Sequence, residues 1–308
     1  MIGAICPLCH ELTGDVLTST LRRGVGTVFH CAKCDLGFLV GEKREGYYHR
    51  QYRDEVNHKA EGGETTPQEI FDTYTRYQQG RINIACPNTK MESVLEIGAS
   101  AGQFLTHMKG IFARRCAIEP DPRCCAFMQA AGIKTDANYL RNSRFYNEKF
   151  DVVCAFQVLE HVDEPRSFLA EVKHVLKPGG TAFIEVPNLY DPLRSVWGIP
   201  EYEKFYFHAD HLFYFSWKSL VKYAVKAGFT KPQVFFTQDY SLLNHIHWLM
   251  NKAPQADCHV GLGPVKFEGK DSGMAAWLSH KLSALNEEYI SMLESTGETS
   301  NLTMILTN

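Results

Sequence analysis

The sequence predicts an α/β fold, with a mostly parallel sheet covered by helices on both faces and a separate small module ahead of it. From residue 92 onward, short apolar runs alternate with amphipathic segments, the pattern of strands joined by helical crossovers. The stretch LEIGASAGQFL (95–105) places small residues where a strand must turn sharply into a helix. Two cysteine pairs, in CPLC (6–9) and CAKC (31–34), predict the small module.

Seven strands follow from the apolar runs, and helices fill the intervals between most of them. We expect strands over 93–100, 114–120, a short segment before Asp136, 150–156, 181–187, 232–237 and 301–307. We expect helices over 101–109, 121–131, 164–176, 216–228 and 273–295. The sheet should therefore be seven-stranded and Rossmann-like.

These elements divide the chain into three parts. We expect a zinc ribbon over 1–40, a connector with one helix over 41–90 and the α/β domain over 91–308, with 238–300 as a helical insertion before the last strand. The connector helix should start at Thr66, because Pro67 suits the first helical position and Glu69 completes a capping box.

The long helix predicted over 273–295 carries one apolar stripe. Its members should be buried: Met274, Trp277, Leu278, Leu282, Leu285, Tyr289 and Leu293. The helix is long enough to serve a homodimer, and packing on its own sheet explains the stripe equally well.

Composition narrows the classes of partner. The 308 residues carry a net charge of −3, and no basic run exceeds two residues, which argues against a nucleic-acid partner. No apolar run approaches the roughly 18 residues of a membrane span. A cytoplasmic protein without a membrane partner is expected.

The four paired cysteines are predicted to bind zinc. Cys6, Cys9, Cys31 and Cys34 have the ligand spacing of a zinc ribbon, and residues 12–30 would supply a β-hairpin between the pairs. Four thiolates fill a tetrahedral site, so the zinc should be structural. The other cysteines are expected as thiols in or near the core: Cys86, Cys116, Cys124, Cys125, Cys154 and Cys258.

The glycine turn is the predicted ligand site of the α/β domain. Gly98, Ser100 and Gly102 let the backbone approach a ligand, and their spacing differs from the G-x-G-x-x-G dinucleotide pattern. Glu119 ends the second strand, where it can hold ribose hydroxyls, and Glu96 adds a second carboxylate. Two carboxylates disfavour a pyrophosphate and suit a cationic ligand that bears a ribose.

Residues 92–237 resemble the class I S-adenosylmethionine-dependent methyltransferases. The resemblance rests on the glycine turn, on AIEPD (117–121), on FDVVCAFQVLEHVDEPRSFLAEVKHVLKPGGTAFIEVPN (150–188) and on HADHLFYFSWKSLVKYAVKAGF (208–229). It implies S-adenosylmethionine as cofactor. The chain has Ser100 at the family's middle glycine, a small residue that should preserve binding.

The resemblance also implies a role for each matching position. Glu96, Gly98, Ser100, Gly102 and Phe104 would surround the methionine part of the donor, and Glu119 would hold the ribose. Asp136 or Asn138 would lie near the adenine, and Phe156, Gln157, Val158 and His161 would complete the site. Core packing explains Phe156 and Val158 equally well, and a structural helix start explains Glu160 and His161.

The acceptor site is expected in KFYFHADHLFYFS (204–216). A sugar hydroxyl, or a carbon beside a ketone, must lose a proton, so we expect His211 as general base, oriented by Asp210 or His208. Alternatively, His211 caps the helix near Ser216 or packs beside the aromatic residues. Most of these aromatics should be core: Tyr202, Phe205, Tyr206, Phe207, Phe213 and Tyr214.

The whole arrangement resembles sugar C-methyltransferases and their relatives in surface-polysaccharide and antibiotic pathways. The resemblance implies a small sugar-like acceptor, with Tyr47, Tyr48 and Tyr52 beside it. The chain has His208-Ala209-Asp210-His211 where that family has Tyr-x-Glu-His, and it is short after 237, so transfer to oxygen or to carbon both stay open. The competing hypotheses are a ribosomal RNA methyltransferase and a zinc-ribbon adaptor on a non-catalytic fold.

Overall fold

The computed structural model describes residues 3–22, 24–41, 65–85, 91–256 and 259–308. The chain forms two compact units. The ribbon unit consists of Met1–Glu42, Pro187–Ser219 and Phe235–Thr303, and the sheet unit of Lys43–Val186, Leu220–Val234 and Met304–Asn308. The predicted division near residues 40 and 90 stays a prediction.

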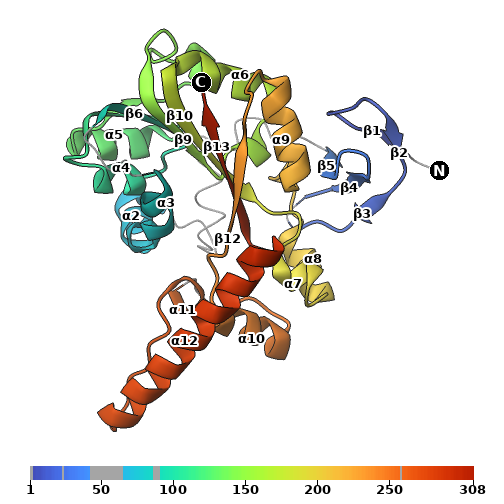
Figure 1. Ribbon diagram of the computed structural model, residues 1–308, viewed down its shortest axis with the longest axis vertical. Coiled ribbons are helices and arrows are strands. Elements are labelled where there is room, and N and C mark those ends of the chain that lie inside the picture. The colour runs from blue at the N-terminus through green and yellow to red at the C-terminus, as the bar shows by residue number, and fades with distance from the viewer. Residues whose placement is uncertain (1–2, 23, 42–64, 86–90, 257–258) are drawn as a thin grey trace. The chain divides into compact units, whose positions relative to one another are not determined.

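The predicted seven-stranded, mostly parallel sheet is confirmed (Figure 1). Its strands follow the order β12, β13, β10, β9, β6, β7, β8. They are β6 (Met91–Ile97), β7 (Phe112–Ile118), β8 (Lys134–Asp136), β9 (Phe150–Phe156), β10 (Leu176–Pro187), β12 (Gln233–Thr237) and β13 (Asn301–Thr307). Strands β8, β7, β6, β9 and β10 pair in parallel, so their carboxyl ends share one edge. Strand β10 starts earlier than Thr181, because Leu176 already pairs with Phe150.

Helices cover both faces of this sheet. Figure 1 shows α4 (Gln103–His107) and α5 (Pro122–Ala130) on one side, with α6 (Pro165–Val175) and α9 (Trp217–Lys226) on the other. Ahead of the sheet lie α2 (Pro67–Tyr74) and α3 (Gln79–Ala85). The predicted capping box of α2 is confirmed, with Thr66 and Glu69 bonded to each other's backbone. Short 3₁₀ turns are η2 (Thr75–Tyr77), η3 (Leu140–Asn142) and η4 (Leu159–His161).

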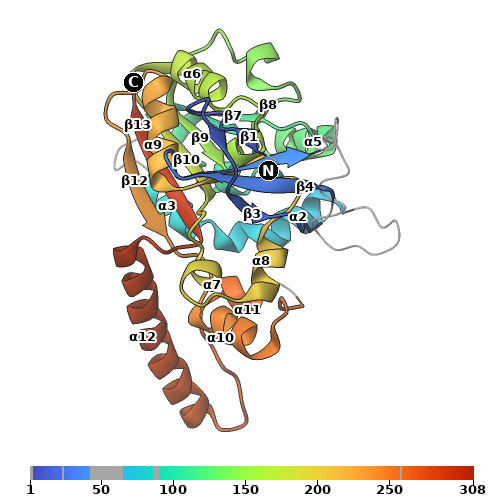
Figure 2. The same cartoon turned by 90° about the vertical axis from the view of Figure 1, so that its right-hand side faces the viewer.

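The ribbon unit contains a four-stranded antiparallel sheet, in the order β11, β5, β4, β3. Its strands are β3 (Val16–Thr18), β4 (Gly26–Cys31), β5 (Leu36–Gly41) and β11 (Phe213–Phe215), and a separate pair joins β1 (Ala4–Ile5) to β2 (Leu12–Thr13). Figure 2 shows β3 and β4 side by side, as predicted for the hairpin between the cysteine pairs. Strand β11 comes from the segment in which we expected the acceptor site.

The helices of the ribbon unit are α7 (Pro192–Ser195), α8 (Pro200–Tyr206), α10 (Leu242–Asn251), α11 (His259–Leu262) and α12 (Ser272–Thr296). Helix α12 confirms the long predicted helix, but its buried stripe was wrong. Leu293 is buried and Leu282 and Tyr289 are half-buried, whereas four stripe residues are exposed: Met274, Trp277, Leu278 and Leu285. The reason is that the face α12 turns toward its own unit mixes polar side chains with the buried part of the stripe. Among the described helices, none combines the length and apolar character needed to cross a membrane.

Candidate active site

The turn after β6 has the backbone that the glycines predicted. Gly98 and Gly102 have φ values of 73° and 77°, in the left-handed region, and Ser100 lies there too at 55°. A Cβ on Gly98 would stand 2.5 Å from Cγ2 of Val158, so a larger residue would meet a steric clash as well as backbone strain. Glycine at position 98 is therefore required by the fold of the turn.

Glu119 holds this turn in place. The side chain is 2% exposed, at the end of β7. Its Oε2 accepts the backbone N–H of Ser100 at 2.6 Å, and its Oε1 accepts the N–H of Asp121 at 3.1 Å. The residue predicted to bind the ribose thus also joins the turns that follow two neighbouring strands.

Glu96 is a buried carboxyl beside the same turn. It is 4% exposed, and its Oε2 has no hydrogen-bond partner in the described part of the chain. Burial is the main cause that raises its pKa to about 8; the positive charge of Arg81 opposes the shift, and the negative charges of Glu119 and Glu185 add to it. A cationic ligand nearby would favour the ionised form, as expected for the donor site.

Arg81 and Glu185 are residues that the sequence analysis missed. Arg81 of α3 donates to Glu185 at the end of β10, with Nη2 2.6 Å from Oε1, and its guanidinium lies 4.8 Å from the ring centre of Phe156. Gln157 donates to the same carboxylate at 3.1 Å. A lone glutamate within the apolar run AFIEVP could have indicated Glu185, but no local signal indicated Arg81.

The remaining predicted donor residues lie at or near the carboxyl ends of the strands. Asp136 accepts the backbone and side-chain N–H groups of Asn138 at 2.9 and 2.8 Å, and hydrogen bonding from these groups and from Arg144 lowers its pKa despite partial burial. Phe104 and Phe156 are buried edge to face, 5.1 Å apart, within the core cluster. The packing of Phe156 matches the core alternative given for that residue.

The pair in LEHV lies in η4. Glu160 is fully buried, and burial raises its pKa to about 8. The Nε2 of His161 lies 3.7 Å from Oε1 of Glu160. Val158, whose side chain lies beside Gly98 of the glycine turn, stands two residues before Glu160. The donor residues thus form one cluster within the sheet unit, and their predicted roles stay predictions.

The predicted acceptor residues are brought together in the ribbon unit. Nδ1 of His208 lies 3.5 Å from Oδ2 of Asp210, and the rings of His208 and His211 lie 3.8 Å apart. His211 also contacts the ring of Tyr214, with the centroids 5.8 Å apart. Ser216, rather than His211, caps α9, because its Oγ accepts the N–H of Ser219. One alternative for His211, capping that helix, is therefore excluded.

This segment is built into the N-terminal ribbon. Strand β11 pairs with β5, and the backbone of Arg22 exchanges hydrogen bonds with Phe207 and Ala209 on either side of His208. The hydroxyl of buried Tyr214 accepts from the N–H of His208 and donates to its carbonyl, both at 2.9 Å. His208 is thereby fixed by a strand register and by an aromatic side chain. Of the predicted aromatic core, four residues are buried: Tyr202, Phe207, Phe213 and Tyr214. Phe205 and Tyr206 are half-buried and pack against the core.

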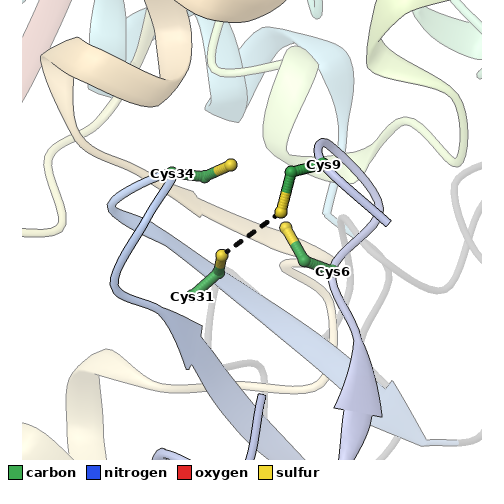
Figure 3. A group of neighbouring side chains, drawn as sticks. All are labelled: Cys6, Cys9, Cys31 and Cys34. Carbon is green, nitrogen blue, oxygen red and sulfur yellow. Dashed lines mark hydrogen bonds between the residues drawn. The ribbon is translucent and has the colours of Figure 1, made fainter. Parts of the chain in front are cut away.

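The four paired cysteines converge as the spacing predicted. Figure 3 shows their sulfur atoms directed toward a common centre, and all four lie within 4.8 Å of one another. The Sγ atoms of Cys9 and Cys31 are 3.7 Å apart, close to the ~3.8 Å separation in a tetrahedral zinc–thiolate site. Burial raises the pKa of Cys6 to about 11, so metal binding would displace a proton there. The geometry and the donor set fit zinc.

Both cysteine knuckles end in a left-handed residue. His10 follows Cys9 with φ 63°, and Asp35 follows Cys34 with φ 58°. Asp35 also links the second knuckle to the acceptor segment: its Oδ1 accepts the hydroxyl of Tyr190 at 2.6 Å, and its carbonyl accepts that of Ser216, also at 2.6 Å. Ligand spacing predicted the knuckle, but the role of Asp35 was missed.

The other cysteine predictions can be checked in part. Cys116, Cys124, Cys125 and Cys154 are buried free thiols, as expected. Cys86 and Cys258 lie outside the described residues, and so do Tyr47, Tyr48 and Tyr52.

Comparison with known proteins adds the family. Residues 51–234, more than half of the chain, match the model of the methyltransferase domain. The ubiquinone biosynthesis O-methyltransferase of Dictyostelium discoideum mitochondria is 42% identical over 57 residues, 17% of this chain and 18% of that protein. The tRNA U34 carboxymethyltransferase of Campylobacter curvus is 26% identical over 125 residues, 37% of this chain and 41% of that protein. The chain thus spans less than half the length of these relatives.

Solved structures agree at the level of the fold. A chain in the complex of the Haloferax volcanii Trm112 methyltransferase activator with a methyltransferase aligns with a TM-score of 0.50 and 14% identity, over 78% of this chain and 92% of that chain. The sheet order, the glycine turn and the family match lead to one assignment. The chain belongs to the methyltransferase-domain family, as a class I S-adenosylmethionine-dependent member.

Proposed function

We propose that this protein transfers a methyl group from S-adenosylmethionine to oxygen or carbon of a small sugar-like acceptor, a nucleotide sugar or a surface-polysaccharide or antibiotic precursor. His211 is the general base, and Asp210 and His208 orient it. The observation that carries this proposal is the cluster of two imidazoles and a carboxylate, held in place by strand pairing within the ribbon unit.

For methyl transfer, the protein has to place the acceptor in line with the methyl group and to remove one proton from the acceptor. The sulfonium–methyl bond breaks as the new oxygen–methyl or carbon–methyl bond forms, and the electron pair of the broken bond stays on sulfur. The acceptor's proton passes to the imidazole of His211. A base of this kind typically contributes about 10²–10⁴-fold to the rate.

The carboxylates of the sheet unit support a cationic donor. Glu96 offers a buried oxygen that has no hydrogen-bond partner among the described residues, and Glu119 stands at the end of β7, the position that holds ribose hydroxyls in this class of fold. Arg81, which pairs with Glu185, places a cation near these carboxylates. The two carboxylates suit the cationic groups of the donor.

Zinc has a supporting role in this proposal. Cys6, Cys9, Cys31 and Cys34 would hold it as four thiolates, which leaves no open coordination position for a substrate. The metal would stabilise the ribbon whose β5 strand pairs with β11. Its contribution to turnover is therefore indirect, through the acceptor segment.

The experiment is methyl transfer from labelled donor to a panel of nucleotide-linked sugars and ribosomal RNA, with zinc-loaded protein. Label on a sugar supports the proposal, and label on RNA alone contradicts it. His211→Asn should lower the rate constant about 10²-fold or more while donor binding persists. His280→Asn, a change at an exposed histidine of α12, is the matched control. Unchanged turnover by His211→Asn would remove this residue from the role of base.

A further inference from the structure

Helix α12 presents its polar side chains to its own unit. Ser279 accepts the N–H of Phe267 at 2.8 Å, and Ser283 donates to the carbonyl of Val265 at 3.0 Å. Asn286 accepts the first amide of α10 at 2.7 Å. These contacts attach the helix through hydrogen bonds, where a helix of a globular domain ordinarily uses its apolar stripe.

Several large apolar side chains of α12 lie on another face and are exposed, although Leu293 is buried and Leu282 and Tyr289 are half-buried. Trp277 is 56% exposed, Met274 61%, Leu285 49% and Met292 66%. Figures 1 and 2 show α12 extending along one side of the unit, with α10 and α11 beside only part of it. A row of large apolar side chains opposite a hydrogen-bonded face is the pattern of a helix with an additional partner.

The exposed row has the spacing of a coiled-coil seam. Its positions alternate by four and three residues, which places them on one face of a two-helix pair. The row reads Met274, Leu278, Lys281, Leu285, Glu288 and Met292. Lys281 and Glu288 interrupt it, and neither forms an ion pair with any residue in the described ranges.

We propose that α12 pairs antiparallel with α12 of a second copy of this chain. With the two-fold axis at the level of Ser283 along the helix, Met274 meets Met292 of the second copy, and Lys281 meets Leu285. Every seam position then has a seam position opposite it. Lys281 also comes within one helical turn of the other copy's Glu288, and the symmetry repeats this contact.

The charges of Lys281 and Glu288 favour an antiparallel orientation of the two helices and a second copy of this chain as the partner. In a parallel pair, Lys281 would face Lys281 and Glu288 would face Glu288, two repulsive contacts. In the antiparallel pair the same residues attract. The seam is therefore complementary to itself in one orientation, which favours a second copy over an unrelated helix.

Sedimentation velocity of the full chain tests the proposal. The wild type should sediment as a dimer. Lys281→Glu and Glu288→Lys should each raise the dissociation constant about tenfold, since each reverses two symmetric contacts. An equimolar mixture of the two variants should recover the dimer, because opposite charges then face each other. Glu287→Lys makes the same change in charge one residue off the seam and should leave the dimer unchanged.

A photo-crosslinking benzoylphenylalanine at position 274 reports the direction. The antiparallel pair should give crosslinks to the peptide of the second chain that carries Met292, and crosslinks to the peptide around Met274 would overturn the proposed orientation. A monomeric wild type, or equal effects of Glu287→Lys and Glu288→Lys, would overturn the self-pairing itself. A shift only on addition of lipid vesicles would assign the face to a membrane surface and equally contradict it. None of these readouts depends on methyl transfer.

Discussion

The second cysteine knuckle and the glycine turn both bend the chain through left-handed backbone, but different forces hold them. At Gly98 and Gly102 the glycines accept this conformation without strain, and the protein's own Glu119 fixes the backbone between them. At Asp35 a residue with a side chain adopts φ 58° next to Cys34, one of the four cysteines predicted to hold zinc. The sheet unit therefore completes its turn with a carboxylate of the protein, whereas we expect the knuckle of the ribbon to need a metal ion.

This difference teaches where each unit is vulnerable. Loss of metal should damage the ribbon and the acceptor segment paired with it, while the donor turn should survive. A steric change at the donor turn should do the reverse. Four experiments separate the two units, from the largest expected effect to the smallest.

Removing one zinc ligand should have the largest effect. Cys31→Ser leaves three thiolates, and structural zinc sites in small modules contribute about 10–16 kcal/mol of apparent binding free energy. We expect loss of zinc by elemental analysis and loss of methyl transfer, with donor affinity by calorimetry retained. Cys116→Ala, which removes a buried thiol of the sheet unit, should keep the zinc. Full transfer by a metal-free Cys31→Ser protein would contradict the role of the ribbon.

Adding a methyl group at the glycine turn should have the second largest effect. Gly98→Ala adds a Cβ 2.5 Å from Val158 Cγ2 at a residue with positive φ, and should cost roughly 3 kcal/mol, about a hundredfold in donor affinity. Gly110→Ala is the matched control: its φ is 85°, but nothing lies within 4 Å of the added Cβ. It should cost only about 1 kcal/mol of stability. Equal losses of donor affinity would mean that the clash with Val158 is irrelevant.

The buried carboxyl of Glu96 should make stability depend on pH. Its pKa of about 8 in the folded protein lies above the ordinary 4.5, so the folded state keeps a proton that the unfolded state has lost. The free energy of unfolding should therefore fall as pH rises between these values. Glutamine cannot ionise, so at pH 8 the free energy of unfolding of Glu96→Gln should exceed that of the wild type by on the order of 2 kcal/mol.

Urea titrations at pH 5 and pH 8 measure this effect. Glu92→Gln, a change at an exposed glutamate of the same strand, should keep the wild-type fall with pH. If Glu96→Gln shows that fall undiminished, the carboxyl of Glu96 is ionised in the folded protein.

The smallest effect should come from the hydrogen bond between the second knuckle and Tyr190, which lies just before α7. Tyr190→Phe removes the hydroxyl that donates to Asp35 Oδ1 and should cost about 1–2 kcal/mol. A double-mutant cycle with Asp35→Asn should show coupling of the two changes in unfolding experiments. Additive effects would indicate that the bond contributes nothing to holding the knuckle.

Much of the fold could be predicted from local patterns in the sequence. Strand–helix alternation, the capping box at Thr66 and the small residues of the glycine turn act over a few residues, and the structure reproduces each of them. The cysteine spacing likewise predicted the cluster of four sulfur atoms. Such patterns can be predicted because they depend on residues that are close together in the sequence.

Contacts between distant segments could not be predicted in this way. The pair Arg81–Glu185 joins residues 104 positions apart, and no periodicity relates α3 to the end of β10. The stripe of α12 also misled the prediction, because an apolar row looks the same whether it packs on its own unit or faces outward. The hydrogen bonds of Ser279, Ser283 and Asn286, together with the burial of Leu293, show which face is turned inward.

The sequence by itself thus determined the class of sheet, the glycine turn and the cluster of four cysteines, since each depends on local backbone geometry or on residue spacing. The tertiary structure alone decided that β11 would join the ribbon and fix His208 beside Asp210 and His211. Strands some 175 residues apart pair only if the sheet has a free edge and the side chains of the two strands fit together. Neither condition can be predicted from one segment alone.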